Sequence, residues 1–131
     1  MKILATDMDG TFLDHLGAYD KARLDNLLDA CEAKDYVFTV ASGRALLALE
    51  ELFDGFVDRI AIIAENGALV QYKGEVLFES KLEPKDYLEI ADTTLALPTC
   101  EGVLLSGRRG AYAPNDADPA YLKAMERYYE N

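Results

Sequence analysis

Hydrophobic and polar positions along the chain follow two patterns, and each predicts a different kind of element. Short continuous apolar runs are typical of strands buried on both faces of a parallel sheet. Three such runs end in polar residues: Ile3–Ala5, Tyr36–Ala41 and Ile60–Ala64. Between them, apolar residues recur every three or four positions, the period of an amphipathic helix, over residues 20–34 and 45–54. The order strand, helix, strand predicts an α/β fold built on a parallel sheet.

The first predicted helix carries apolar residues on one face and charged residues on the other. Leu24, Leu27, Leu28 and Cys31 occupy its i, i+3, i+4 and i+7 positions, and Asp20 is the expected N-cap. Cys31 is therefore expected in the core. The chain has only one other cysteine, so it has neither a disulfide framework nor a metal-ligand spacing of cysteines.

The hydrophobic period changes after the third strand, which indicates a different architecture in the second half of the chain. Two alternating segments flank Lys73-Gly74 and predict a β-hairpin. The composition changes again near Pro84, and we place a domain boundary there, between residues 1–82 and residues 83–131. The elements expected in this half are the hairpin strands Leu69–Tyr72 and Glu75–Phe78, the helices Pro84–Leu95 and Asp118–Tyr129, and the strands Gly102–Ser106 and Ala111–Ala113.

Composition and charge exclude several classes of function. Half of the 131 residues are apolar, which is enough for a core. No apolar run reaches about 18 residues, so no membrane span is expected, and the N-terminus lacks the pattern of a secretory signal. We therefore expect a cytoplasmic protein. With 24 acidic and 13 basic residues the net charge is −11, which argues against nucleic acid and anionic membranes as partners.

The first strand ends in two aspartates, and this is the strongest chemical signal in the sequence. Asp7 and Asp9 precede Gly10 and Thr11 in the pattern D-x-D-G-T. Carboxylates this close repel unless a cation or a hydrogen-bond network stabilises them, and Mg²⁺ prefers such oxygen ligands. We predict Asp7 and Asp9 as metal ligands, with one as a nucleophile towards phosphorus and the other as a general acid and base. The alternative interpretation is an acidic turn chosen for its backbone geometry.

Polar residues also follow the second and third strands. Ser42, Gly43 and Arg44 lie where the second strand meets a helix, whose first N–H groups favour an anion. We predict that these residues bind a phosphoryl group, although Ser42 could serve only as a helix cap. Asn66-Gly67 follows the third strand and is either part of the same site or a turn with left-handed backbone geometry.

These motifs resemble those of the haloacid dehalogenase superfamily of aspartate-nucleophile phosphatases. D-M-D-G-T-F-L at the first strand is similar to the first motif of its Cof-type members, and Ser42-Gly43-Arg44 matches the second. The resemblance implies a Rossmann-like core followed by the beginning of an α/β cap. It also implies Mg²⁺-dependent removal of phosphate from a small phosphorylated metabolite, through an aspartyl-phosphate on Asp7. Asp9 is implied as the acid and base, and Thr11, Ser42, Gly43, Arg44 and Asn66 as phosphate-binding residues.

Two motifs of that superfamily, a lysine and a metal-binding acidic pair, do not appear in these 131 residues. We therefore expect the N-terminal portion of such an enzyme, with an incomplete core and a first strand whose apolar edge promotes self-association. A non-catalytic protein that keeps only the metal and phosphate pocket is an alternative. A receiver-type signalling domain fits poorly because its acidic residues are adjacent. The sequence leaves open any role of His15, Glu65, Arg108 and Arg109.

Overall fold

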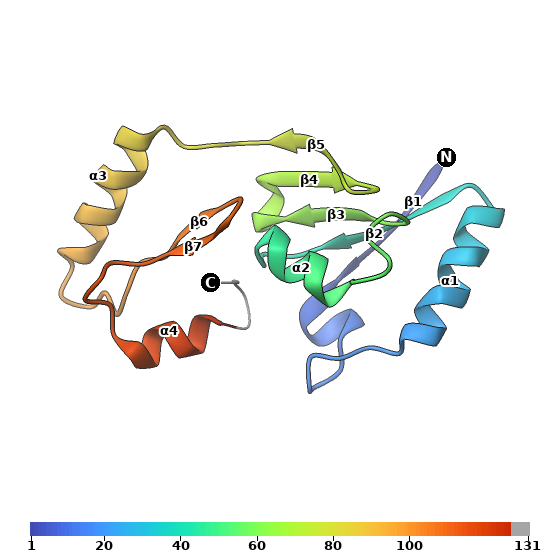
Figure 1. Ribbon diagram of the computed structural model, residues 1–131, viewed down its shortest axis with the longest axis horizontal. Coiled ribbons are helices and arrows are strands. Elements are labelled where there is room, and N and C mark those ends of the chain that lie inside the picture. Colours follow the sequence, from blue (N-terminus) through green and yellow to red (C-terminus); the bar gives the residue numbers. More distant parts are fainter. Residues whose placement is uncertain (127–131) are drawn as a thin grey trace.

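A five-stranded mixed sheet forms the larger part of the computed structural model, which describes residues 1–126 (Figure 1). The strands follow the chain order β1-β2-β3-β4-β5 across the sheet. The first three are parallel, and β4 and β5 join them as an antiparallel hairpin. Their bounds are β1 Lys2–Asp7, β2 Tyr36–Ala41, β3 Ala61–Ala64, β4 Leu69–Tyr72 and β5 Glu75–Glu79. The predicted α/β fold with a parallel core is confirmed.

Two helices supply the crossover connections between the parallel strands. The first, α1 (Lys21–Ala33), begins where the Asp20 side chain accepts a hydrogen bond from the backbone N–H of Arg23, as the sequence predicts. The second, α2 (Leu46–Leu52), is shorter than the predicted 45–54. Both helices contribute to one hydrophobic core beneath the sheet, because their apolar residues pack against those of β2, β3 and β4. The largest fully buried side chains of this core are those of Met8, Leu24, Leu28, Val40, Leu49, Phe53, Ile60 and Ile62.

An aromatic cluster anchors the loop between β1 and α1. The ring of Phe12 lies 5.4 Å from that of Tyr19 and 5.6 Å from that of Phe38, between ring centroids. Tyr19 stacks on Phe53 at 5.1 Å, and its hydroxyl donates a hydrogen bond to the backbone carbonyl of Leu52. Burial, with a contribution from a nearby aspartate, raises the pKa of Tyr19. These contacts fix the loop that follows the predicted catalytic aspartates against α2.

The second half of the chain forms a smaller lobe beyond the carboxyl ends of the parallel strands (Figure 1). It contains α3 (Pro84–Leu95), the two-stranded hairpin of β6 (Leu105–Gly107) and β7 (Gly110–Tyr112), and α4 (Pro119–Met125). Both α3 and α4 start with a proline in the first turn, as expected. Strand β6 is shorter than the predicted 102–106, whereas β7 has the length of the predicted 111–113 and begins one residue earlier. Residues 127–129 of the predicted last helix lie outside the described residues.

The expectation that the first strand is buried on both faces is wrong. Within residues 1–126, β1 pairs only with β2 and forms an edge of the sheet. Ile3 is 66% exposed and Leu4 41% exposed. An apolar run therefore predicts a strand of a parallel sheet, but it does not predict whether other parts of this chain bury the two faces of that strand. The accompanying expectation, an exposed apolar edge at this strand, is confirmed.

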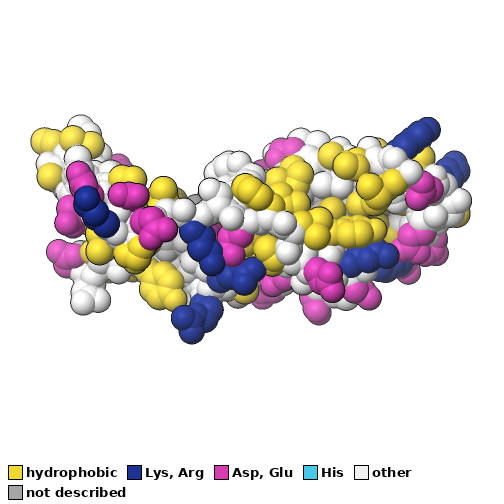
Figure 2. Space-filling model, turned by 90° about the horizontal axis from the view of Figure 1, so that it is seen from above, with side chains coloured by type: hydrophobic (Ala, Val, Ile, Leu, Met, Phe, Trp, Pro, Cys, Tyr) yellow, Lys and Arg dark blue, Asp and Glu magenta, His cyan; other side chains and the backbone are white. Residues whose placement is uncertain are grey.

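The opposite edge of the sheet also presents apolar side chains. Val76, Leu77 and Phe78 of β5 are consecutive and exposed. Figure 2, which looks onto this side of the molecule, shows hydrophobic side chains gathered over the sheet, with acidic and basic groups around them. No helix among residues 1–126 is long and apolar enough to cross a membrane.

Candidate active site

Three strand ends meet at one edge of the sheet, and the predicted site residues lie there. Strand register places Asp7 beside Ala41 and Ala41 beside Ile63, so β1, β2 and β3 end almost level. The backbone N–H of Ser42 continues this pairing by donating to the carbonyl of Ile63 at 2.9 Å. The carboxyl ends of parallel strands are where open α/β folds bind ligands. The order of the strands thus brings the two predicted motifs side by side.

The chain turns sharply after β1 through the short helical segment η1 (Met8–Phe12). Met8 is fully buried and holds the turn in the core, whereas Gly10 adopts a positive φ of 77° that a residue with a side chain rarely adopts. The Thr11 hydroxyl donates a long hydrogen bond, 3.4 Å, to Oδ2 of Asp7. Asp7 is exposed, so its carboxylate stands at the mouth of the site with access to solvent.

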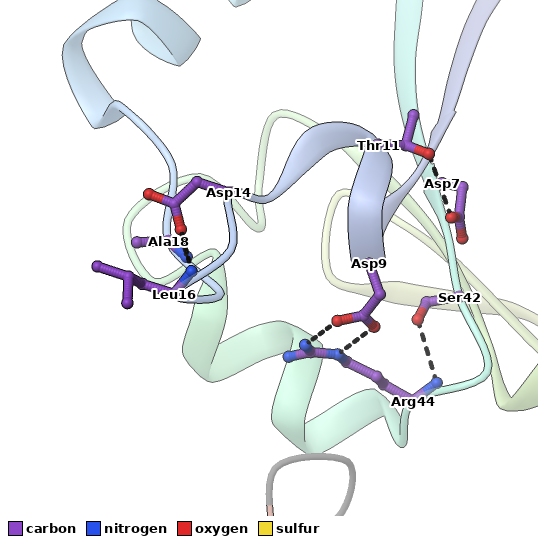
Figure 3. Close-up of polar contacts among 8 residues, drawn as sticks. All are labelled: Asp7, Asp9, Thr11, Asp14, Leu16, Ala18, Ser42 and Arg44. Carbon is purple, nitrogen blue, oxygen red and sulfur yellow. Dashed lines mark hydrogen bonds and ion pairs between the residues drawn. The ribbon is translucent and has the colours of Figure 1, made fainter.

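Asp9 is held by Arg44, which comes from the end of the neighbouring strand (Figure 3). Arg44 Nη2 donates to Asp9 Oδ1 at 2.7 Å, and Arg44 Nε donates to Oδ2 at 3.1 Å. This two-bond arrangement matches the fork of a guanidinium to a carboxylate and fixes the orientation of both groups. The arginine side chain is only 10% exposed and the aspartate side chain 38%. Arg44 is therefore largely buried, and its two hydrogen bonds fix the orientation of the Asp9 carboxylate.

The loops after β2 and β3 interlock through their backbones. The N–H of Asn66 donates to the carbonyl of Ser42 at 3.2 Å, and the N–H of Glu65 donates to the carbonyl of Arg44 at 3.0 Å. Glu65 and Asn66 both adopt positive φ, 53° and 54°, in the short turn η2 (Glu65–Gly67). Such a backbone costs about 1 kcal/mol or more per residue and persists only where its surroundings enforce it.

Gly43 is required by the close approach of Asn66. A Cβ added at Gly43 would lie 2.8 Å from Oδ1 of Asn66 and 3.2 Å from its Nδ2. The space beside this glycine is therefore filled by the Asn66 amide. The turn at Asn66-Gly67 is left-handed, as one interpretation predicts. Its asparagine also packs against Gly43 of the second motif, and a role of Asn66 in phosphate binding stays a prediction. The Ser42 hydroxyl accepts a hydrogen bond from the N–H of Arg44 at 3.2 Å, within the turn before α2. Ser42 does not cap this helix, because the N-cap of α2 is Ala45 and makes no side-chain cap hydrogen bond.

A cleft of about 810 Å³ opens between the sheet and the smaller lobe. Its walls include Leu46 of α2, Glu65 of η2 and Tyr87 of α3, with the hairpin β6–β7 opposite. Polar contacts join the lobes across it: the Ser106 hydroxyl donates to Glu65 Oε1 at 2.6 Å, and Arg108 pairs with Glu79 at 3.2 Å. Asp7, Asp9 and Ser42 do not line this cleft. It meets their site at Glu65, whose backbone contacts Arg44.

Comparison with known proteins identifies the family. The sequence model of the haloacid dehalogenase-like hydrolases matches residues 4–131. The chain belongs to this family. The resemblance read from the motifs is therefore confirmed, and so is the Rossmann-like α/β core.

Three relatives show how much of a family member this chain represents. A phosphatase from Escherichia coli named 5-amino-6-(5-phospho-D-ribitylamino)uracil phosphatase YbjI is 31% identical over 98% of this chain and 47% of its own length. The crystal structure of SMU.1108c from Streptococcus mutans is 30% identical with a TM-score of 0.88, over 98% of this chain and 48% of that one. A haloacid dehalogenase-like hydrolase from Bacillus subtilis, 22% identical with a TM-score of 0.74 over 96% of this chain and 43% of that one, shares the fold. The chain spans about half the length of these relatives.

The oxygen atoms at the end of β1 fit Mg²⁺ in part. Mg²⁺ commonly takes one or two carboxylates and completes its shell with water and substrate phosphate. Asp7 supplies an exposed carboxylate, but both carboxylate oxygens of Asp9 accept hydrogen bonds from Arg44, which leaves its backbone carbonyl as the better candidate ligand. Within residues 1–126 there is no group of three or more acidic, histidine or cysteine side chains placed to hold a metal ion.

The structure brings together most of the residues that the sequence singled out. Asp7, Asp9, Thr11, Ser42, Gly43, Arg44 and Asn66 all lie at the carboxyl edge of β1 to β3. His15 is exposed in the next loop, where two backbone N–H groups bind the carboxylate of Asp14 at 2.8 and 2.9 Å. These bonds, led by that from Ala18, hold the pKa of Asp14 below its usual value.

The sequence did not predict three contacts: Arg44 with Asp9, Asn66 with Gly43, and Ser106 with Glu65. Each joins residues that are distant along the chain. For the contact between Arg44 and Asp9, the sequence offered one indication: the two residues carry opposite charges and follow neighbouring strands.

Proposed function

We propose that this chain carries the nucleophile half of the active site of a Mg²⁺-dependent phosphatase that acts on a small phosphorylated metabolite. The observation that supports it most directly is the placement of Asp7. Its exposed carboxylate lies at the end of β1, beside the Ser42 loop of β2, with a second aspartate held in the turn that follows. A nucleophile, an acid or base and anion-binding N–H groups at one strand edge are the parts needed for phosphoryl transfer.

In the first step, an oxygen of the Asp7 carboxylate attacks phosphorus, and the bond from phosphorus to the substrate oxygen breaks. The Asp9 carboxyl gives its proton to that leaving oxygen, and the phosphoryl group stays on Asp7. The Ser42 hydroxyl and the N–H groups of the loop at Gly43 donate to the phosphoryl oxygens. Mg²⁺, when bound by Asp7 and the carbonyl of Asp9, supplies positive charge that offsets repulsion between carboxylate and phosphate.

In the second step, water attacks the phosphorus of the aspartyl-phosphate and the bond to the Asp7 oxygen breaks. Asp9, now a carboxylate, accepts the proton of that water. The products are inorganic phosphate and the original Asp7 carboxylate. Asp9 thus alternates between acid and base, which requires its carboxyl group to lie in line with Asp7 in both steps.

One relative and the cleft support the proposed substrate class. The E. coli relative is named for a substrate with a phosphorylated ribityl chain on a uracil ring. In this chain the cleft of about 810 Å³ has apolar walls from Leu46, Leu69 and Ile90 together with the basic Arg108 and Arg109. A phosphate ester whose remaining part combines an apolar or aromatic ring with polar groups fits these walls.

A non-catalytic protein that binds metal and phosphate remains the second candidate. One observation supports it: residues 1–126 contain no cluster of three metal-binding side chains, so these residues alone would hold a metal only weakly and supply little of the positive charge that catalysis needs. Electrostatic stabilisation is often the largest catalytic contribution, and the loss of one well-placed donor typically costs about 10²–10³-fold in rate. A chain that binds Mg²⁺ and phosphate without forming a phosphorylated aspartate would fit this candidate.

The deciding experiment compares the parent protein with Asp7→Asn in phosphate release from phosphorylated sugars and a ribityl phosphate, with excess Mg²⁺. The two side chains are nearly isosteric, so the fold should survive while turnover and covalent labelling by phosphate disappear. Circular dichroism checks the fold. Phosphate release by Asp7→Asn within a few-fold of the parent would refute Asp7 as the nucleophile.

A further inference from the structure

We infer that Arg44 is the positioning residue that aims the Asp9 carboxylate, and that it serves the second step, the attack of water on the phosphorylated aspartate. This inference rests on the proposed function and assigns Arg44 a role other than the phosphate contact predicted from the sequence. The residues lie 35 positions apart, at the ends of two neighbouring strands. Their two hydrogen bonds join the first motif of the site to the second.

The geometry of the pair fixes direction as well as distance. Nε and Nη2 form one edge of the guanidinium plane, and both bind Asp9, at 3.1 and 2.7 Å. An arginine that used this edge for a phosphoryl group would have to release the aspartate. A two-bond contact also holds the carboxylate plane at a set angle, whereas a single lysine-type contact would let it rotate.

Arg44 is itself held by the loops around it. Its backbone N–H donates to the Ser42 hydroxyl at 3.2 Å, and its carbonyl accepts from the N–H of Glu65 at 3.0 Å. The side chain is only 10% exposed, so most of its surface packs against other protein atoms. A charge that is this buried needs a partner. The site thus contains a largely buried cation that is held by the loops at the ends of β2 and β3 and that fixes the orientation of the Asp9 carboxylate.

The ionised carboxylate is the form that accepts two guanidinium hydrogen bonds, and it is also the form that accepts a proton from water. In the second step, the water oxygen bonds to phosphorus, the bond between phosphorus and the Asp7 oxygen breaks, and the water proton passes to Asp9. A carboxylate that rotates away from this water cannot accept its proton, and the second step slows. Misplacement of a catalytic group by about 1 Å can cost about 10²-fold in rate.

Pre-steady-state kinetics with p-nitrophenyl phosphate separates the two steps, because p-nitrophenolate leaves without needing a proton. In the Arg44→Gln variant, we expect the first turnover to stay fast and the steady rate to fall by about 10²-fold. A burst of nitrophenolate close to one per protein should appear, and acid quenching should trap phosphorylated protein for mass spectrometry. Asp9→Asn should give the same burst, and the double variant should be little slower than the worse single variant.

Arg44→Lys and Arg59→Gln are the matched controls. The lysine keeps the positive charge without the two-bond fork, so it should still give the burst. Arg59 also binds carboxylates, those of Asp25, Asp29 and Glu32 on α1, but it lies before the start of β3 and not at the carboxyl end of a strand. Its glutamine variant is expected to lower thermal stability and leave both kinetic phases unchanged.

Other roles of Arg44 give different results, and each would overturn the inference. A phosphate-binding role predicts a slower first turnover and a higher KM for Arg44→Gln, without a burst. A purely structural role predicts a smaller burst at unchanged rates, because fewer molecules would be folded. A parent protein that forms no phosphorylated aspartate and releases no phosphate would instead contradict the proposed function, and the role of Arg44 with it.

Discussion

At the scale of single residues, the two aspartates of the site lie in different surroundings. Asp7 is exposed and contacts Thr11 through one long hydrogen bond of 3.4 Å. Asp9 accepts two shorter bonds from the nearly buried Arg44. Removing the charge of Asp9 therefore changes the environment of a buried cation, whereas removing that of Asp7 does not. Substitutions of Asp7 and Asp9 should therefore differ in their effect on the stability of the protein as well as on its activity.

Asp9→Asn should slow turnover by about 10²–10⁴-fold, the usual contribution of a general acid or base. Its amide cannot accept two guanidinium hydrogen bonds, so the free energy of unfolding should fall by about 1–3 kcal/mol, the cost of an unsatisfied charged group. Mg²⁺ affinity, measured by calorimetry, should change little, because the proposed ligand is the Asp9 carbonyl. Asp7→Asn is the control and should keep the stability of the parent. Loss of Mg²⁺ binding in Asp9→Asn would make Asp9 a side-chain ligand.

The identity of these residues was readable from the sequence, whereas their pairing was not. Asp7 and Asp9 follow an apolar run directly, and Ser42 follows the next one, so local pattern placed them at strand ends. The link between Arg44 and Asp9 depends on the side-by-side order of β1 and β2 and on side-chain packing between distant loops. A sequence pattern carries no direct information about such contacts.

At the scale of elements, helices and parallel strands were predicted best because their periods are strong. α1 lies within the predicted residues 20–34, and β2 spans the predicted residues 36–41. The short strands of the smaller lobe were predicted less well, since β6 has only three residues, Leu105–Gly107. A strand this short has too few positions to show an alternating pattern, and its pairing is set by the turn between β6 and β7.

The junction of the second and third strand ends can be tested with two glycines. Gly43 has no positive φ, so Gly43→Ala strains no backbone; its Cβ instead meets the Asn66 amide at 2.8 Å. We expect a small change in melting temperature and a clear rise in KM. Gly55 has φ 87° with open space around it. Gly55→Ala should therefore cost about 1–2 kcal/mol of stability and leave KM unchanged. Equal effects of both variants on KM would refute a specific role of Gly43 beside Asn66.

At the scale of the whole molecule, both edges of the sheet bear exposed apolar side chains. Within residues 1–126, β1 has a strand partner on one side only, and Ile3 on it is 66% exposed. An edge strand with exposed apolar side chains is a template for pairing with another chain. The net charge of −11 opposes association of identical copies, and salt screens that repulsion. Raising the ionic strength therefore weakens the charge repulsion between copies, whereas the apolar attraction at the β1 edge is not screened.

We expect the 131-residue chain to self-associate through β1, and to do so more strongly as salt concentration rises. Light scattering over a range of protein concentrations should show an increasing mean mass. Ile3→Lys places a charge on the edge and should weaken association, whereas Leu97→Lys is the matched control, because Leu97 is 55% exposed in the smaller lobe. A monomer at every concentration and salt level would contradict the prediction. Equal weakening by both variants would show that added charge, and not the β1 edge, controls association.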